Sequence, residues 1–212
     1  MPKFELMIEP LALNVLKLKR RSSAHSALAH SSADLIARAR AGEHDAFRVI
    51  FNRFAKPIAS FINDLVNNRD LAEELTQETF VRAYKNLGQI RDDTKLSTWL
   101  FGIGKNVARE ALRSQVRATG DENIEAAAPV TSNATSPSEA LMGKELQSAI
   151  RKALRSLDDD QRLVFILKVF RQCRYDEISE ITGFSIAKVK TDLHRARAEL
   201  RKLVRPFLEH TQ

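Results

Sequence analysis

Apolar side chains recur every three or four residues across the first half of the chain, which is the spacing of one face of a helix. The first stripe ends before Asn67 and Asn68 and consists of Phe47, Ile50, Phe51, Phe54, Ile58, Phe61, Ile62 and Leu65. The pattern predicts a long amphipathic helix here and helical structure throughout Asp34 to Arg117.

Two more helices are predicted in the same part of the chain. Asp70 can cap the second helix, with Glu73 as its capping-box partner, and Gly88 is a natural stop. Its inward residues are expected to be Leu71, Leu75, Phe80, Tyr84 and Leu87. A polar loop from Gln89 to Leu96 follows, and Ser97 can cap the third helix. That helix is expected to turn inward Trp99, Leu100, Ile103, Val107 and Leu112.

The chain changes character at residues 118–138, where small and polar residues dominate and no apolar period remains. We interpret this segment as a flexible linker. It separates a helical domain at 33–117 from a second one at 139–208. The predicted fold class is therefore all-α, with two small helical domains.

Residues 1–32 require a separate interpretation. Their apolar segment, Leu11 to Leu18, precedes most of the positive charges, whereas a secretory signal has its charges first. We interpret these residues as a flexible extension. An over-long start, with Met7 as the alternative, and a helix lying on a membrane surface are the other interpretations.

The second domain has the pattern of a helix-turn-helix. Asp158 can cap its first helix, Tyr175 to Ile181 is a short helix, Gly183 supplies a turn residue with positive φ, and Ser185 can cap the last helix. The inward face of the last helix is expected to hold Ile186, Val189, Leu193, Ala196, Leu200 and Leu203. Its other face carries Lys188, Lys190, Thr191, His194, Arg195 and Arg201.

Such a helix enters the major groove of DNA and presents side chains to base edges. Arg195 and Lys188 have the chemistry to bond guanine, while Lys190, Arg197 and Arg201 suit phosphates. The alternative is a solvated basic face on an ordinary bundle helix.

A second basic stripe lies on the third predicted helix. Lys105, Arg109, Arg113 and Arg117 recur every four residues, with Trp99 and Asn106 nearby. Cations beside aromatic and amide groups are typical of sites that bind single-stranded DNA. The alternative is a core role for Trp99 and a solubilising role for the stripe.

The second predicted helix has the opposite charge. Its acidic and amide residues are Asp70, Glu73, Glu74, Gln77 and Glu78. An acidic ridge beside apolar residues repels DNA and suits a protein partner with basic helices. A solvated acidic face is the alternative interpretation.

Composition and the motifs present in the sequence limit the classes of function that fit the chain. The net charge of +7 favours a polyanionic partner, and a single cysteine, Cys173, fits a reducing cytoplasm. The chain has no P-loop, no GxGxxG motif, no HExxH motif and no CxxC pair. We therefore expect no enzyme activity, cofactor, metal site or small-molecule substrate, and we expect Cys173 to be a core residue.

Three segments together resemble a known family. The sequence DLAEELTQETFVRAYKNL at 70–87, the sequence STWLFGIGKNVAREALR at 97–113 and the block Leu157–Leu203 resemble bacterial RNA polymerase sigma factors of the extracytoplasmic-function (ECF) group. The resemblance covers about 34–117 and 139–205.

The resemblance implies two domains, sigma domain 2 and sigma domain 4, which bind core RNA polymerase and direct it to promoters. The acidic helix would dock on the beta-prime clamp helices, the second domain on the beta flap, and an anti-sigma factor would hold the protein inactive. The implied residues for melting the minus-10 element are Trp99, Lys105, Asn106, Arg109 and Arg113. Those for reading the minus-35 element are Lys188, Lys190, Thr191, His194 and Arg195.

Some positions depart from the family pattern. Gln172 stands where the family often has glycine, so a residue with a side chain must tolerate the turn. Cys173 also departs from the pattern. Asp192 stands where arginine is commoner, and its carboxylate is expected to favour cytosine or disfavour phosphate.

Two other functions are compatible with parts of the sequence. An ordinary transcriptional regulator would bind specific duplex DNA alone, but it gives no role to the acidic helix or to the Lys105–Arg117 stripe. An RNA-modifying enzyme or nuclease would need a clustered carboxylate or metal site, which the sequence does not display.

Overall fold

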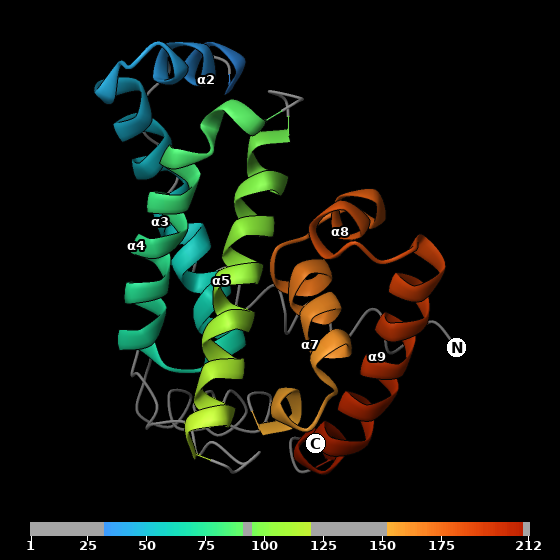
Figure 1. Cartoon of the computed structure of the whole chain (residues 1–212). Helices are drawn as coiled ribbons and strands as arrows, with labels where there is room; N and C mark the ends of the chain where they lie inside the picture. Colours follow the sequence, from blue (N-terminus) through green and yellow to red (C-terminus); the bar gives the residue numbers. More distant parts are fainter. Residues whose placement is uncertain (1–31, 91–94, 120–151, 210–212) are drawn as a thin grey trace, which may run out of the picture.

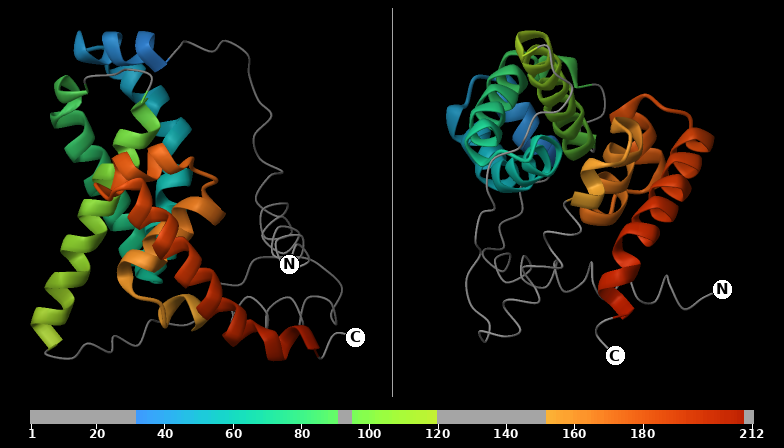
Figure 2. Two further views of the ribbon diagram at one scale, coloured as in Figure 1. Left: turned by 90° about the vertical axis from the view of Figure 1, so that its right-hand side faces the viewer. Right: turned by 90° about the horizontal axis from the view of Figure 1, so that it is seen from below.

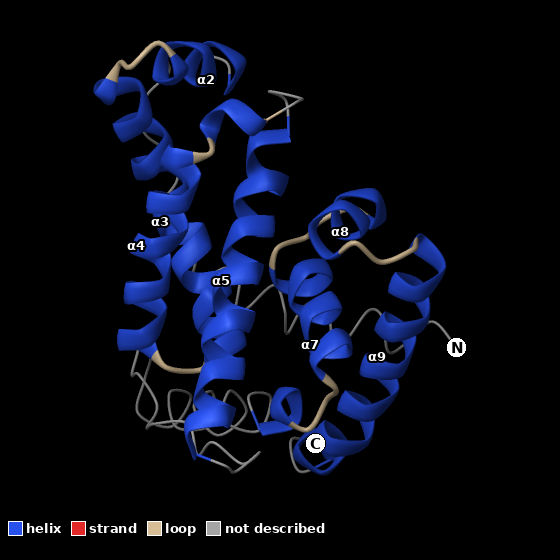
Figure 3. Cartoon of the chain, viewed as in Figure 1, coloured by secondary structure: helices blue, strands red, loops and turns tan. Residues whose placement is uncertain are grey.

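The computed structural model describes residues 32–90, 95–119 and 152–209, and within these ranges it contains helices and no strand (Figure 3). The predicted all-α fold class is confirmed. Residues 1–31 of the predicted extension, residues 120–138 of the predicted linker and residues 139–151 lie outside the described residues, whereas Ser32 begins a helix. The elements are α2 (Ser32–Arg40), α3 (His44–Val66), α4 (Arg69–Lys85), η2 (Leu87–Gln89), α5 (Leu96–Thr119), α7 (Asp159–Phe165), η4 (Ile166–Phe170), α8 (Tyr175–Thr182) and α9 (Ile186–Glu209).

Helices α3, α4 and α5 pack side by side, and α2 crosses one end of them (Figure 1). We call α2 to α5 the first bundle. Its core contains Ile58, Phe61 and Leu100, all fully buried, and the rings of Phe61 and Phe101 meet edge to face at 5.1 Å. Arg40 of α2 donates to the Leu87 carbonyl at 3.2 Å and so ties α2 to the connection between α4 and α5.

The helix ends of the first bundle differ in part from the prediction. Asn67 ends α3 in the left-handed conformation, with φ of 50°, as the asparagine pair indicated. The N-cap of α4 is Asn68, whose side chain accepts from the Leu71 amide at 3.1 Å, so the assignment of this cap to Asp70 was wrong. Ser97 is not a cap either, because α5 already begins at the buried Leu96.

Helices α7, η4, α8 and α9 form the second bundle around fully buried Val164, Ile178 and Val189. Gly183 has φ of 78° between α8 and α9, and the Ser185 hydroxyl accepts from the Lys188 amide at 3.2 Å. The predicted helix-turn-helix, with its glycine turn and serine cap, is therefore confirmed in this part of the chain. Ile186 was predicted to face inward, but it is exposed.

The turn before α8 has an unusual backbone. Residues Ile166–Phe170 form a π-helix, and the Arg171 amide donates to the carbonyl of Ile166, five residues back, at 3.1 Å. Gln172 follows with φ of 57°, so a residue with a side chain does occupy this left-handed position. The Cys173 amide then closes the turn on the Leu167 carbonyl at 3.0 Å.

The two bundles touch along α5. Helix α8 packs against α5, and η4 approaches α3, so the second bundle lies beside the first (Figures 1 and 2). Arg171 crosses this contact and donates to the Ser60 hydroxyl at 3.0 Å and to the Asp64 carboxylate.

Candidate nucleic-acid and protein interfaces

The acidic residues of α4 do not all point the same way. Asp70, Glu74 and Gln77 are exposed, and within the described residues neither of the two carboxylates forms an ion pair. Glu73 is exposed but pairs with Arg69 at 3.1 Å. Asp70, Glu74 and Gln77 lie four and three residues apart and therefore form one free stripe, which we call the acidic face.

Glu78, the fifth predicted residue, lies one turn after Glu74 but is half-buried and paired. Its carboxylate pairs with Arg82 at 2.7 Å, and Arg82 also reaches Glu110 of α5 at 2.7 Å. The hydrogen bond that Arg82 donates to Glu78, followed by the one that it donates to Glu110, raises the pKa of Arg82. Arg82 thus joins α4 to α5 and also holds Glu78, so only part of Glu78 remains available to a partner.

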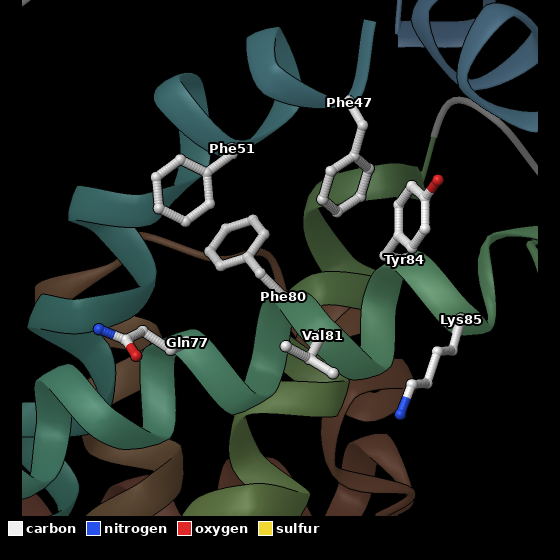
Figure 4. A pocket seen from close by; sticks show the side chains of 7 residues that line it. All are labelled: Phe47, Phe51, Gln77, Phe80, Val81, Tyr84 and Lys85. Atoms are coloured by element: carbon white, nitrogen blue, oxygen red, sulfur yellow. The ribbon is translucent and has the colours of Figure 1, made fainter. Parts of the chain in front are cut away.

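An apolar groove continues the acidic face toward the end of α4 (Figure 4). Its volume is about 390 Å³, and it is lined by Phe47, Phe51, Gln77, Phe80, Val81, Tyr84 and Lys85. The ring pairs Phe47–Tyr84 and Phe51–Phe80 span it at 4.9 and 4.8 Å. The sequence reasoning missed this groove because it assigned Tyr84 to the core, whereas Tyr84 is 44% exposed.

Only the second half of the basic stripe of α5 is fully exposed. Lys105 is half-buried, and burial, followed by the charge of Arg109, lowers its pKa. Arg109 pairs with Asp160 of α7 at 2.6 Å and lies over the Phe184 ring at 6.0 Å. Arg113 and Arg117, one and two turns further, are exposed.

The other two residues expected at the minus-10 element, Asn106 and Trp99, differ from each other in exposure. Asn106 is exposed on α5, beside the basic stripe. Trp99 is half-buried and packs against the core of the first bundle. Its ring therefore has a structural role and presents only part of its surface.

Four of the five residues implied for the minus-35 element are exposed on α9. These are Lys190, Thr191, His194 and Arg195. The Thr191 hydroxyl donates to the Ala187 carbonyl at 3.0 Å, and the Lys190 ammonium lies 5.7 Å from the centre of the Tyr175 ring. This face has the cations and polar groups that a DNA groove requires.

Lys188 differs from its neighbours on α9. Its ammonium pairs with Asp192 at 2.7 Å and with Asp160 at 3.2 Å, and it lies over the Phe184 ring at 4.6 Å. The hydrogen bond with Asp192 is the largest cause that raises the pKa of Lys188. Asp192 itself is only 5% exposed. The carboxylate that was expected to favour cytosine or disfavour phosphate faces inward here and holds Lys188, and its effect on DNA stays a prediction.

Asp160 brings the two predicted DNA surfaces together. Its two carboxylate oxygens contact Arg109 of α5 and Lys188 of α9. Sequence reasoning did not single out Asp160, since it is one of three consecutive aspartates in a helix start, and no local signal marks its contact with a residue 51 positions away.

Cys173 is partly buried against the core, as expected. Burial is the main cause that raises the pKa of its thiol to about 11, so the thiol is protonated at neutral pH. In the part of the chain that the structure describes, no group of three or more histidine, cysteine or carboxylate side chains is placed to hold a metal ion. Among the same residues, no helix is both long and apolar enough to cross a membrane.

Comparison with known families identifies both bundles. The family model "Sigma-70 region 2" matches residues 50–118, and "Sigma-70, region 4" matches residues 147–200. The chain is 30% identical over 171 residues to the ECF RNA polymerase sigma factor SigW of Bacillus subtilis, covering 77% of this chain and 91% of that protein. It is 25% identical over 181 residues to the ECF RNA polymerase sigma-E factor of Escherichia coli K12, covering 82% and 94%.

Solved structures agree with this result. The sigma factor RpoE from Bartonella quintana, determined in complex with the anti-sigma factor NepR, superposes with a TM-score of 0.62 and 26% identity. The alignment covers 75% of this chain and 96% of that one. CnrH, in complex with the cytosolic domain of CnrY, gives a TM-score of 0.61 at 23% identity over 82% and 97% of the two chains, a likeness of fold alone.

Proposed function

The chain belongs to the ECF family of RNA polymerase sigma factors. From this premise we propose which of its surfaces bind core polymerase and which bind promoter DNA. It directs promoter-specific transcription initiation, with core RNA polymerase and promoter DNA as its partners. We assign residues 33–117 as sigma domain 2 and residues 139–208 as sigma domain 4, joined by the linker at 118–138.

The acidic face of α4 binds the clamp helices of the beta-prime subunit. Its exposed carboxylates, Asp70 and Glu74, have no competing cation in the described residues, so a basic partner helix can pair with them directly. The adjoining apolar groove supplies buried area that a charged stripe alone lacks. Gln77 belongs to this face, and Glu73 and Glu78, each paired with an arginine of α4, border it.

The basic stripe of α5 binds the minus-10 element. Lys105, Arg109 and Arg113 follow one ridge, which suits the phosphates of a single strand. Asn106 is exposed beside the ridge and can bond a base, while the partly buried Trp99 supports the strand from the core side. Contacts with an unstacked base offset the cost of opening the duplex, which is a few kcal/mol per step.

Helix α9 reads the minus-35 element through Lys190, Thr191, His194 and Arg195, with Lys188 at its start. The second bundle also docks on the beta flap, and an anti-sigma factor is a further partner, as in the solved complex of RpoE with NepR. The observation that carries the whole proposal is the separation of charge: the protein-binding face on α4 is acidic, and both DNA-binding faces are basic.

The docking of α4 can be tested by charge reversal. The double variant Asp70→Lys with Glu74→Lys should lose binding to core polymerase and promoter-dependent transcription, because it places two cations opposite a basic partner. Both side chains are exposed, so the melting temperature should change little. Binding is measured by co-elution of purified protein and core polymerase on a sizing column.

A matched control makes the same change in charge elsewhere. The double variant Asp45→Lys with Glu199→Lys also reverses two exposed carboxylates, one on α3 and one on α9. It should bind core polymerase like the unmodified protein. Equal losses for the two double variants would mean that net charge matters and that the assigned face is wrong.

A further inference from the structure

Lys188 lies in the first turn of α9 and is held by groups of its own bundle. Its ammonium lies 2.7 Å from the carboxylate of Asp192, one turn later on the same helix, and 3.2 Å from that of Asp160 on α7. The Phe184 ring centre is 4.6 Å from the same nitrogen. Helices α7 and α9 pack side by side within the second bundle (Figure 1), so this arrangement does not depend on where the first bundle lies.

Asp192 is the member of this cluster that lies inside the protein. Its side chain is 7% exposed, and within the described residues its ion-pair partner is Lys188. A buried carboxylate is tolerated when a cation pairs with it, and it destabilises the fold strongly when that cation is removed. Movement of Lys188 toward DNA would leave the Asp192 carboxylate in that unpaired state.

A contact between Lys188 and a base would not offset this loss. An ammonium has three N–H donors, and the ammonium of Lys188 already contacts two carboxylates. A guanine edge offers two acceptors, O6 and N7, and a good contact with both is worth less free energy than an intact buried ion pair. The balance of free energy therefore favours the pair over the base.

Lys190, two residues further along α9, is in a different position. It is exposed, and among the described residues it forms no ion pair. Its ammonium lies 5.7 Å from the centre of the Tyr175 ring, a weak contact that a base or a phosphate can replace. The exposed face of α9 is thus free to meet DNA, whereas Lys188 at its edge is engaged by the protein.

We propose that Asp192 is a positioning residue that keeps Lys188 from reading the minus-35 element and leaves that role to the exposed residues between Lys190 and Arg195. The proposal rests on the DNA-binding role assigned to α9 above. Instead of contacting a base, Lys188 ties the start of α9 to α7 through Asp160. The base pair that faces the first turn of α9 therefore contributes little to the choice of promoter.

The first measurement tests the hold on Lys188 in the free, full-length protein. A limiting amount of acetic anhydride acetylates unprotonated amines, and mass spectrometry gives the extent at Lys188 and Lys190. Asp192→Asn should speed the reaction of Lys188 about two- to fivefold, the value of one partly exposed charge contact, and leave Lys190 unchanged. Glu199→Gln is the matched control, because it removes an exposed carboxylate of α9 that pairs with another lysine. Equal Lys188 rates in the two variants would overturn the proposal.

The second measurement tests the reading of DNA by the assembled polymerase. Core polymerase with each full-length variant transcribes random-sequence duplex DNA, and the sequenced RNA 5′ ends give the base frequencies of the shared minus-35 element. Asp192→Asn should gain a preference for guanine at one position, about fivefold or more, because the released ammonium of Lys188 can contact O6 and N7. The double variant Lys188→Met with Asp192→Asn should lose that gain. Lys190→Met is the comparison, and it should lose a preference that the unmodified protein has.

Two other outcomes would contradict the proposal. If Asp192 only stabilised the fold, Asp192→Asn would lower transcription from all starts and gain no base preference. If Lys188 read DNA, the double variant would lose a base preference that the unmodified protein has. Should Asp192→Asn alone not fold, the double variant, which removes both charges, decides between these outcomes. Unmodified protein that starts no transcription with core polymerase would contradict the assigned function, while the acetylation rates would still show whether Asp192 holds Lys188.

Discussion

Two residues adopt the left-handed backbone conformation at either end of α8. Gly183 follows the helix with φ of 78°, and a methyl group there would meet nothing within 4 Å. Gln172 precedes the helix with φ of 57° and is exposed. A residue with a side chain costs about 1 to 2 kcal/mol in this conformation, whereas glycine does not. The turn before α8, which holds Arg171, therefore has a conformational cost at Gln172 that the turn after α8 does not have at Gly183.

Gln172→Gly should therefore raise the free energy of unfolding by about 0.5 to 1 kcal/mol, the cost of the conformation less the entropy of glycine. Gly183→Ala should lower it by about 1 kcal/mol. Urea denaturation followed by circular dichroism measures both. Gly102→Ala, within α5, is the control, since a helical glycine has no such strain and alanine should stabilise it. A loss of stability in Gln172→Gly would show that its side chain makes a contact that outweighs the strain.

At the scale of the element, α4 combines two kinds of surface along one helix. Its first half presents the carboxylates of the acidic face, and its second half presents Val81 and Tyr84 to the groove. Charged residues direct the encounter with a partner, and apolar residues near the centre of an interface carry most of the affinity. The two halves of α4 should therefore respond differently to salt.

A charge placed in the groove tests its share in docking. Val81→Asp should weaken binding to core polymerase by about tenfold or more, because a carboxylate would be buried against the partner. Val116→Asp, on α5, is the control, since Val116 is 37% exposed and Val81 45%. Titration of labelled core polymerase with each variant gives the affinities. Equal affinities for the two variants would place the groove outside the interface.

Local patterns predicted the elements better than their boundaries. The stripe from Phe47 to Leu65 and the Gly183–Ser185 turn were found because period and cap chemistry act within a few residues. The cap of α4 was placed at Asp70 instead of Asn68, since both residue types cap equally well. Sequence period also could not show that Tyr84 remains uncovered, because only the packing of α3 and α4 decides which edge of a stripe stays exposed.

Contacts between the bundles were beyond the reach of sequence patterns. Arg171 and Asp64 are 107 residues apart, and Arg109 and Asp160 are 51 apart. Their charges look like ordinary surface charges until the bundles are brought together. Asp192 is a different case, because its partner Lys188 lies four residues earlier in the same helix; the spacing is local, but the burial of Asp192 depends on packing.

At the scale of the whole molecule, an ion pair joins Lys95, just before α5, to Glu180 of α8. It offers a test of whether the two bundles are in contact in solution. Lys95→Glu and Glu180→Lys should each destabilise the chain slightly, and the double variant should recover the loss, with a coupling of about 0.2 to 1 kcal/mol. Urea denaturation of the four proteins gives this coupling. Zero coupling would mean that the two side chains do not meet in the free protein.

The π-helix of η4 affects which insertions and deletions this segment can tolerate during evolution. Its wider turn accommodates one residue more than an α-helix would, and the following residue, Arg171, reaches Asp64 from that offset. Each residue of a helix advances the next by about 100° around the axis. Because the wider turn absorbs one residue, loss of a single codon between Ile166 and Phe170 would return it to α-helical width and avoid the rotation of about 100° that a deletion in a regular helix causes. A lineage can therefore gain or lose one residue in this turn and keep Arg171 directed toward α3, without altering the residues that choose the promoter.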